Sequence, residues 1–416
     1  MHVSHDSGHF EDAVVKHNQT TQKNRILTKP PMSTIEEGAQ SNSALHSKAT
    51  TTSFSNFGHN KDRNPTRYLL PMRSVLGGGS NSQYERFKVA IAFAASTNRT
   101  LVLTPFFLHG GHVRGYNDEH MRSFDVTFDA EELEKLLPLS TIEQYNQDCK
   151  AHNTKAVGWD IHYEPYEQTR EQFYFDVLGI KLPTIYDVKI LEHDKTFDEL
   201  RADTENEQCV AFSVDGPYIL HRTRHREGSD KAVDKYLLPT KDVRAVGERF
   251  SRMLCQGQSY LSLHWRNKSS EMPCFFGREK EGRLCAPFRE KTRELAEIAA
   301  DAVSDLMKRE HIKCIYVACP LWSLEIIDIL AKRIPKKDIF ISADLAFPDK
   351  YKQLSDDYYM VSLVEQEIAY RAAIFVSAGY SNWSDFVRER RDAEGMVTHN
   401  IRDLAGIPED VGLDMI

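Results

Sequence analysis

The sequence predicts an α/β protein built from two Rossmann-like halves. Three observations lead to this fold class. A strand, a glycine-rich turn and an amphipathic helix follow one another from Tyr68, and the strand Thr100–Thr104 completes a β-α-β unit. From Ser259 onward, strand and helix patterns alternate regularly, as in a doubly wound sheet. No sequence repeat links the two halves, so each is expected to form its own sheet.

The first half opens with a strand at Tyr68–Arg73 and a helix at Asn81–Thr97 whose apolar residues fit a period of 3.6. The right-handed crossover rule makes the strand Tyr68–Arg73 parallel to Thr100–Thr104. A helix at Ala130–Leu137 and a strand at Cys209–Val214 follow. The remaining residues between them mix aromatic, acidic and histidine-containing loops and give no regular pattern.

The second half is entered through a charged helical stretch, Lys231–Met253, which is interrupted at Pro239. Five strands are then predicted, at residues 259–264, 312–318, 337–342, 358–363 and 373–377. Four helices separate them or follow them, at residues 288–309, 322–333, 364–372 and 382–391.

The length and composition fit two domains with full-sized cores. The chain has 416 residues, of which 41% are hydrophobic and 27% are charged. We predict an N-terminal domain over residues 67–250 and a C-terminal domain over residues 251–416. Residues 1–66 are rich in Ser, Thr, Asn, His and Gln and lack apolar periodicity, which predicts a disordered leader or stem.

The charge excludes some classes of partner. A net charge of −8 and a pI near 6.1 argue against a nucleic-acid or anionic-membrane binder. No stretch approaches the ~20 apolar residues of a membrane span, and the N-terminus lacks the apolar core of a signal peptide. An anionic ligand would therefore be held by local groups, such as a few arginines and helix N-termini.

The glycine run Gly77–Asn81 lies between a strand and a helix. Glycines there let the backbone approach a ligand, and the N-terminus of the following helix favours phosphate. A tight turn explains such a run equally well. The spacing is not G-x-G-x-x-G, and no acidic residue ends the next strand, which argues against a dinucleotide site.

The segment Ser262–Arg266 ends a predicted strand. Period two puts His264 and Arg266 on one face at the carboxyl end, where open α/β sheets bind ligands. A fixed cation there can stabilise charge that develops on a diphosphate leaving group. The alternative is an arginine paired with a surface acid and a histidine packed on a loop.

The segment Ala378–Ser384 follows a strand and opens a helix. Ser381 or Asn382 is expected to cap that helix, with Ser384 or Asp385 returning a hydrogen bond. Hydroxyls and free N–H groups together form an anion site, although capping alone also explains Ser381.

No metal ion is expected. The sequence contains no Asp-x-Asp, the usual manganese-binding element of metal-dependent sugar transferases. His109 and His112 lie on a glycine loop but lack further ligands nearby. Arginine and helix dipoles would then have to neutralise a leaving diphosphate.

The chain has seven cysteines without a C-x-x-C pair, which argues against a structural zinc site, and their odd number leaves at least one unpaired within the chain. Cys274 and Cys285 bracket a polar, glycine-containing loop and are either a disulfide or two free thiols. Four N-x-[S/T] sequons give weak support for the secretory route. They lie at Asn18, Asn98, Asn267 and Asn382.

These segments together resemble the GDP-fucose protein O-fucosyltransferase family. Gly78–Asn81 and Asn98–Leu103 are similar to its G-G-x-N and N-R/A-T-L-V-L-P motifs, and His264–Arg266 is similar to its H-x-R. The end of the chain is similar to its D-Q, F-I-G, S-x-F-S/T and R-x-R pattern. The matching segments are Glu365–Ile368, Phe375–Ser377, Ser381–Ser384 and Arg388–Arg390. The likeness runs from Tyr68 to Asp392 and is poor over residues 105–250.

The resemblance implies a GT-B fold, in which two Rossmann-like domains face a central cleft with the acceptor on the N-terminal side and the nucleotide sugar on the C-terminal side. It implies inverting, metal-independent transfer of L-fucose from GDP-fucose to a Ser or Thr hydroxyl of a protein. The acceptor would be a small cysteine-rich module and the compartment the lumen of the endoplasmic reticulum or Golgi.

The resemblance also implies roles for residues. Arg266 would be catalytic, contacting the β-phosphate and the glycosidic oxygen. The residues implied in binding GDP-fucose are Gly78, Gly79, Ser80, Asn81, His264, Arg266, Ser381, Asn382 and Ser384.

The sequence departs from the family at two places. One branch of the family carries a glutamate that serves as base where this chain has Gly78, and many members have V-A-T-D where this chain has Val317–Pro320. The base is unassigned, with Glu85 and Asp125 as candidates. Two other hypotheses therefore stay open, namely a catalytically silent relative that binds a nucleotide or a partner protein, and a nucleotide-dependent oxidoreductase.

Overall fold

The fold is described from a computed structural model of the chain. The structure describes residues 66–72, 79–107, 121–149, 154–159, 178–179, 189–191, 197–214, 228–266, 282–320, 323–377 and 381–407. They all fall within one compact unit, Asp62–Ile416. The leader predicted over residues 1–66 lies outside the described residues except for its last residue. The domain boundary at residue 250 stays a prediction.

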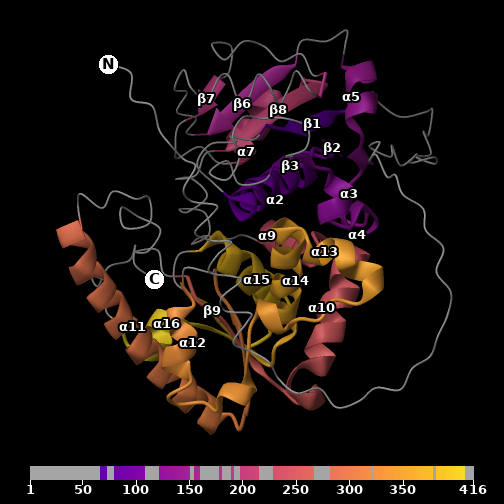
Figure 1. The fold of residues 1–416 in the computed structure, drawn as a ribbon. Helices are drawn as coiled ribbons and strands as arrows, with labels where there is room; N and C mark the ends of the chain where they lie inside the picture. Colours follow the sequence, from indigo (N-terminus) through magenta and orange to yellow (C-terminus); the bar gives the residue numbers. More distant parts are fainter. Residues whose placement is uncertain are drawn as a thin grey trace, which may run out of the picture. The chain divides into compact units, whose positions relative to one another are not determined.

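The first sheet has six parallel strands in the spatial order β5-β2-β1-β8-β6-β7 (Figure 1). The strands are β1 (Tyr68–Pro71), β2 (Thr100–Val102), β5 (Leu139–Ser140), β6 (Lys155–Trp159), β7 (Lys189–Leu191) and β8 (Cys209–Val214). The parallel pairing of β1 with β2 confirms the crossover prediction. A short antiparallel pair, β3 (Phe106–Phe107) with β4 (Met121–Arg122), stands apart from this sheet.

Both faces of the first sheet are covered by apolar side chains. The helix α2 (Ser80–Ser96) lies on one face, where Phe93 stacks on Phe212 of β8 with ring centroids 4.8 Å apart. The helix α5 (Ile142–Asp148) lies on the other face, where Tyr145 meets Tyr68 of β1 edge to face. The short helices α3 (Phe124–Thr127), α4 (Ala130–Glu134) and α7 (Phe197–Thr204) complete this half.

The second sheet has five parallel strands in the order β11-β10-β9-β12-β13. The strands are β9 (Leu261–His264), β10 (Ile315–Ala318), β11 (Ile339–Phe340), β12 (Ile374–Ser377) and β13 (Thr398–Asn400). The helices around it are α11 (Gly282–Arg309), α12 (Glu325–Leu330), α13 (Lys352–Ser355), α14 (Tyr358–Arg371), α15 (Asn382–Ala393) and α16 (Ile401–Ala405).

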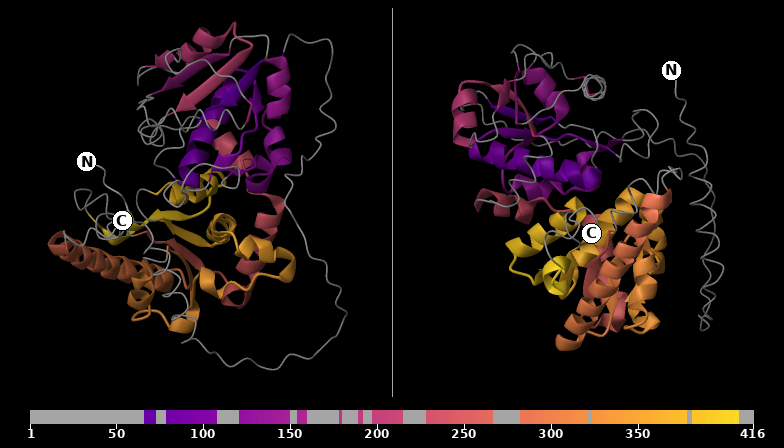
Figure 2. Two further views of the ribbon diagram at one scale, coloured as in Figure 1. Left: turned by 45° about the horizontal axis from the view of Figure 1, so that its top comes forward. Right: turned by 90° about the vertical axis from the view of Figure 1, so that its left-hand side faces the viewer.

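Alternate residues of the second sheet face two different helical layers. Leu261, Ile315 and Val317 pack with α11, α12 and α16, whereas Tyr316 and Phe375 pack with α14 and α15. Figures 1 and 2 show the long helix α11 with α12 and α16 on one side of β9, and α14 with α15 on the other. This is the doubly wound arrangement that the strand and helix alternation predicts.

The strand predicted at residues 358–363 is wrong, because those residues begin α14. The run of Tyr, Met and Val there favours a strand by propensity alone. The structure shows a helical period instead, with Tyr359, Leu363 and Ile368 buried. The side chain of Asp357 caps the helix by accepting a hydrogen bond from the Tyr359 N–H at 2.9 Å. Tertiary burial and the cap outweigh the strand propensity.

The helical stretch predicted at Lys231–Met253 forms two helices, α9 (Gly228–Tyr236) and α10 (Lys241–Met253), separated at Pro239. The helix α10 packs closely on α14. A Cβ added to Gly247 would collide with the Cβ of Glu367, so only glycine permits this approach. A single hydrophobic cluster then runs through α2, α9, α10, α14 and α15.

The cysteines form pairs that the sequence did not indicate. Cys149 is bonded to Cys209 and Cys255 to Cys314, with Cα atoms 6.1 and 6.0 Å apart. Cys319 is a free thiol among the described side chains. The alternatives considered for Cys274 and Cys285 concern side chains outside the described residues.

Candidate functional site

Two helices from different halves of the chain, α2 and α15, run side by side in the same direction. Near the beginning of both helices, the rings of Tyr84 and Phe386 lie 5.6 Å apart. About one turn further along both, the Lys88 Nζ lies 2.8 Å from the Glu389 Oε2. Because the contacts follow the same order along both helices, their N-termini lie at the same end.

These N-termini belong to the edges of the sheets where ligands bind in doubly wound folds. The helix α2 follows β1 and α15 follows β12, so each begins at the carboxyl end of a parallel strand. Gly79 and Ser381 occupy the N-cap positions, and neither makes a side-chain cap hydrogen bond. The first N–H groups of a helix lack intrahelical partners, and its dipole adds partial positive charge there. Paired N-termini of this kind suit an anion such as a diphosphate.

Ser381 differs from the capping role that the sequence predicted. Ser381 is 3% exposed, and its hydroxyl has no hydrogen-bond partner among the described residues. Its backbone carbonyl accepts from the Asp385 N–H at 2.8 Å, as an N-cap residue does. A buried hydroxyl without a partner costs free energy of about 1–3 kcal/mol. Such a group at the beginning of a helix is one that a bound ligand can satisfy.

His264, at the carboxyl end of β9, is fixed by two residues of α15. Its Nδ1 lies 2.6 Å from the Ser384 Oγ, and its ring stacks on Trp383 with centroids 4.2 Å apart. The Trp383 indole N–H donates to the Ser362 Oγ of α14 at 3.0 Å. The predicted residues His264 and Ser384 are therefore in direct contact.

Arg266 lies two residues after the end of β9 and is half-buried at the same carboxyl edge. It is preceded by the buried Trp265, whose N–H donates to the carbonyl of Ala318 at 2.9 Å and extends the pairing of β9 with β10.

The predicted glycine loop is described only in part. Gly78 lies outside the described residues. Gly79, Ser80 and Asn81, at the beginning of α2, are half-buried. The structure therefore places the second part of the loop at the carboxyl edge of the first sheet.

Asn81, in the first turn of α2, is held by a residue that the sequence analysis did not select. The Gln366 Nε2 of α14 donates to the Asn81 Oδ1 at 2.7 Å. Gln366 is 2% exposed. The signal available in the sequence was its place in the Glu365–Ile368 segment, but nothing there indicates contact with a residue so far away along the chain.

A buried ion-pair network lies behind the two N-termini. Lys88 contacts Asp234 of α9 at 2.8 Å as well as Glu85 at 3.3 Å, in addition to Glu389. The Lys88 Nζ also lies 4.5 Å from the centroid of the Phe386 ring. The network joins α2, α9 and α15 and holds the two N-termini in a fixed relation.

The two candidates for a base differ in their surroundings. Glu85 is 2% exposed and lies beside Lys88, whereas Asp125 is exposed on α3. Within the described part of the chain, no group of His, Cys, Asp or Glu has the arrangement of a metal site. Also within it, no helix is long and apolar enough to cross a membrane.

Two of three comparisons place the chain among known proteins. A search of curated protein sequences finds no match. Solved structures of POFUT1 are similar in fold. The complex of POFUT1 with GDP-fucose has a TM-score of 0.54 at 16% identity, covering 81% of this chain and 99% of that one. The POFUT1 complex with GDP has a TM-score of 0.52 at 17% identity, with the same coverage.

At these identities the likeness establishes the fold, which is GT-B. The sequence itself also matches the model of a family, described as GDP-fucose protein O-fucosyltransferase, over residues 68–394. That match contains both sheets from β1 to β12 and both helix N-termini. The chain therefore belongs to the GDP-fucose protein O-fucosyltransferase family.

Proposed function

We propose that the chain transfers L-fucose from GDP-fucose to a serine or threonine hydroxyl of a protein, with inversion at the sugar C1 and without a metal ion. Its family supports fucosyl transfer. The observation that carries the proposal is the pairing of the N-termini of α2 and α15 at the carboxyl edges of the two sheets. A diphosphate between them would meet two positive dipole ends in place of a metal ion.

In the proposal, the second sheet holds most of the donor. The Ser381 hydroxyl and the first N–H groups of α15 bind phosphate oxygens together with Asn382, and the backbone from Gly79 to Asn81 lines the other side. His264 helps to hold the nucleotide with its imidazole, whose ring is fixed by Ser384 and Trp383. A ring held in this way loses little conformational entropy when the ligand binds.

Arg266 would be the catalytic cation. Guanidinium stays charged and can donate to two oxygens at once. Directed at the β-phosphate and at the glycosidic oxygen, it would stabilise the negative charge that appears on GDP as the bond from that oxygen to C1 breaks. The acceptor oxygen forms the new bond to C1 from the opposite face, and its proton leaves to a base that is still to be identified.

The compartment is proposed to be the lumen of the endoplasmic reticulum or Golgi. The disulfides Cys149–Cys209 and Cys255–Cys314 support it, because disulfides form and persist in oxidising compartments. The acceptor is proposed to be a small cysteine-rich protein module of the same compartment, by resemblance to the family.

Binding and transfer test the proposal separately. GDP at about 100 times its Kd should stabilise the protein by about 2.7 kcal/mol in thermal unfolding, and NAD should not. Arg266→Ala should lower transfer from GDP-fucose by about 100-fold or more while the protein stays folded. Arg252→Ala is a matched control, because that arginine is exposed at the end of α10. Normal transfer by Arg266→Ala would refute its role.

The second candidate is a catalytically silent relative that binds GDP or a partner protein. Pro320 favours it, since it follows β10 at the position where many family members carry the aspartate of V-A-T-D. Proline has no carboxylate, and burial raises the pKa of the neighbouring Cys319 thiol well above its ordinary range, so neither residue replaces the charge of that aspartate. GDP binding without transfer to any protein acceptor would support this candidate over the first.

A further inference from the structure

We propose that Gln366 is a positioning residue that sets the orientation of the Asn81 side-chain amide and thereby makes Asn81 a hydrogen-bond donor toward the bound donor substrate. This inference rests on the proposed function, since it concerns the same site. Gln366 belongs to α14 and would act on the ligand through Asn81 in the first turn of α2.

The argument begins with the chemistry of an amide. Asn81 has one acceptor, Oδ1, and one donor, Nδ2, which point in opposite directions from the end of the side chain. The Gln366 Nε2 donates to the Asn81 Oδ1 at 2.7 Å, so this contact occupies the acceptor side. The Nδ2 side is then turned away from Gln366. Asn81 lies in the first turn of α2, where a donor adds to the N–H groups that favour an anion.

Gln366 is well suited to hold a neighbour in one orientation. It is 2% exposed and lies between Glu365 and Glu367 on α14, whose adjoining residues Leu363 and Val364 are in the core. Its Oε1 is buried and has no hydrogen-bond partner among the described residues. Reversing the Asn81 amide alone would bring two N–H donors face to face, so the Gln366 contact couples the orientation of the Asn81 amide to that of Gln366 across the two halves of the chain.

The proposed contact predicts that position 366 needs an uncharged hydrogen-bond donor. A carboxylate there could only accept a hydrogen bond, so it would draw the Asn81 Nδ2 toward itself and turn Oδ1 toward the ligand. An acceptor facing a diphosphate repels it. A methionine of similar volume would remove the hydrogen bond without reversing the amide.

The test measures GDP affinity of the full chain by calorimetry between pH 5.5 and 8.5. Gln366→Glu should weaken GDP binding by about tenfold or more at pH 8.5, as expected for a reversed charge-assisted hydrogen bond. The loss should shrink as pH falls, because a protonated carboxyl can donate to Asn81 again. Gln366→Met should weaken binding by about two- to tenfold at every pH.

Asn81→Ala supplies the decisive comparison. In that background, Gln366→Glu and Gln366→Met should have little further effect, because they act through Asn81. Gln83→Glu is the matched control, since Gln83 is also 2% exposed in α2 but bonds the backbone of Phe107 on both sides of its amide. It should not reproduce the coupling to Asn81.

Full losses from the Gln366 variants in the Asn81→Ala background would overturn the inference, and so would a Gln366→Glu effect that is equal at all pH values. Should Gln366→Glu fail to fold, the cycle of Gln366→Met with Asn81→Ala decides the question alone. A wild-type chain that does not bind GDP at all would instead refute the proposed function.

Discussion

The two ends of the parallel strands in this chain are built in opposite ways. At the N-terminal edge of each sheet, where its strands begin, a buried arginine and a disulfide join neighbouring segments. At the carboxyl edge, where the strands end, helix N-termini lie without side-chain caps, and the Ser381 hydroxyl has no partner among the described residues. Bonds within the chain tie the first edge together, and the second edge leaves helix N-termini and a hydroxyl for a ligand.

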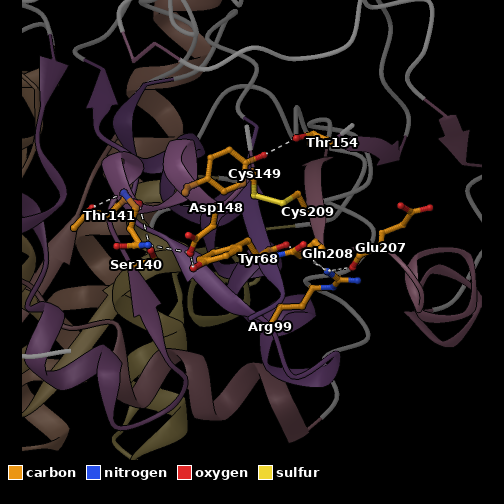
Figure 3. Close-up of a disulfide and its surroundings, with 12 residues drawn as sticks. Tyr68, Arg99, Ser140, Thr141, Asp148, Cys149, Thr154, Glu207, Gln208 and Cys209 are labelled. Atoms are coloured by element: carbon orange, nitrogen blue, oxygen red, sulfur yellow. Dashed lines mark hydrogen bonds between the residues drawn. A yellow bond between two sulfur atoms is a disulfide. The ribbon is translucent and has the colours of Figure 1, made fainter. Parts of the chain in front are cut away.

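Figure 3 shows residues at the N-terminal edge of the first sheet. Arg99, just before β2, donates to the carbonyls of Thr204, Glu207 and Gln208 and to that of Tyr68 at the beginning of β1. The disulfide to Cys149 is attached at Cys209, the first residue of β8. The beginnings of three neighbouring strands are thereby tied together.

The second sheet repeats the arrangement with unrelated sequence. Arg391 of α15 donates to the carbonyls of Ala372 at 2.8 Å and Val397 at 2.6 Å, just before β12 and β13. Cys314, just before β10, carries the disulfide to Cys255. Burial lowers the pKa of both Arg99 and Arg391 to about 10. The comparison shows bonds between distant segments at one edge and groups suited to a ligand at the other.

The largest expected effect comes from opening a disulfide at the N-terminal edge. Cys255 and Cys314 are separated by 59 residues, and closing a loop of that size contributes about 4 kcal/mol in the chain-entropy account. Cys255→Ala with Cys314→Ala should lower the free energy of unfolding by about 2–4 kcal/mol in urea. GDP affinity of the folded protein should stay unchanged. A large loss of GDP affinity would contradict the view that the N-terminal edge contributes to stability and not to binding.

A second expected effect is a pH dependence of stability that comes from Glu365 of α14. Its carboxyl group accepts a hydrogen bond from the Tyr316 hydroxyl at 2.9 Å. Burial raises its pKa to about 7, although the Tyr316 bond lowers it. The folded state thus holds a proton that the unfolded state loses above about pH 4.5. The contribution of Glu365 to the free energy of unfolding should fall by up to about 1.4 kcal/mol per pH unit as pH rises from about 4.5 toward 7.

Glu365→Gln provides the check on that pH dependence. It cannot ionise, so urea titrations from pH 5 to pH 8 should show a flatter stability profile than the wild type. An unchanged slope between the two proteins would mean that another group carries the pH dependence.

A smaller effect is expected at the carboxyl edge itself. Ser381→Ala should weaken GDP binding by about two- to tenfold, because it removes one hydrogen bond to the ligand. It should not lower the free energy of unfolding, since the hydroxyl has no partner within the part of the chain that the structure describes. Calorimetry and urea unfolding measure the two quantities. A destabilised variant with normal GDP affinity would mean that the Ser381 hydroxyl contributes to stability and not to GDP binding.

The smallest effect concerns glycosylation. Asn98 is exposed in the turn before β2, at the N-terminal edge, whereas Asn382 is half-buried as the first residue of α15. Protein from a eukaryotic secretory host should carry a glycan at Asn98 and none at Asn382, by peptide mass spectrometry. Asn98→Gln should leave GDP affinity unchanged. A glycan at Asn382 in active protein would contradict the proposed site.

Much of the carboxyl edge could be predicted from the sequence, because local patterns mark it. The β1–α2 and β12–α15 turns and the end of β9 are visible as strand, turn and helix signals in order. The N-terminal edge could not be predicted in this way. Arg99 bonds to carbonyls about a hundred residues away, and both disulfides link distant cysteines whose pairing no local pattern encodes.

Other features were missed for two different reasons. The strands β5, β7 and β13 have two or three residues each, too few to show a period of two. Gln366 was missed because its partner, Asn81, belongs to the other sheet's first helix. Residues whose importance depends on a distant contact have no signature in their own neighbourhood.

The most direct test of the separation between the edges is amide hydrogen exchange with and without GDP. GDP should slow exchange in peptides that contain the first turns of α2 and α15 and the end of β9. Exchange around Arg99, Arg391 and the two disulfides should stay the same. Protection confined to the N-terminal edges, or GDP binding without protection at either helix N-terminus, would contradict the account.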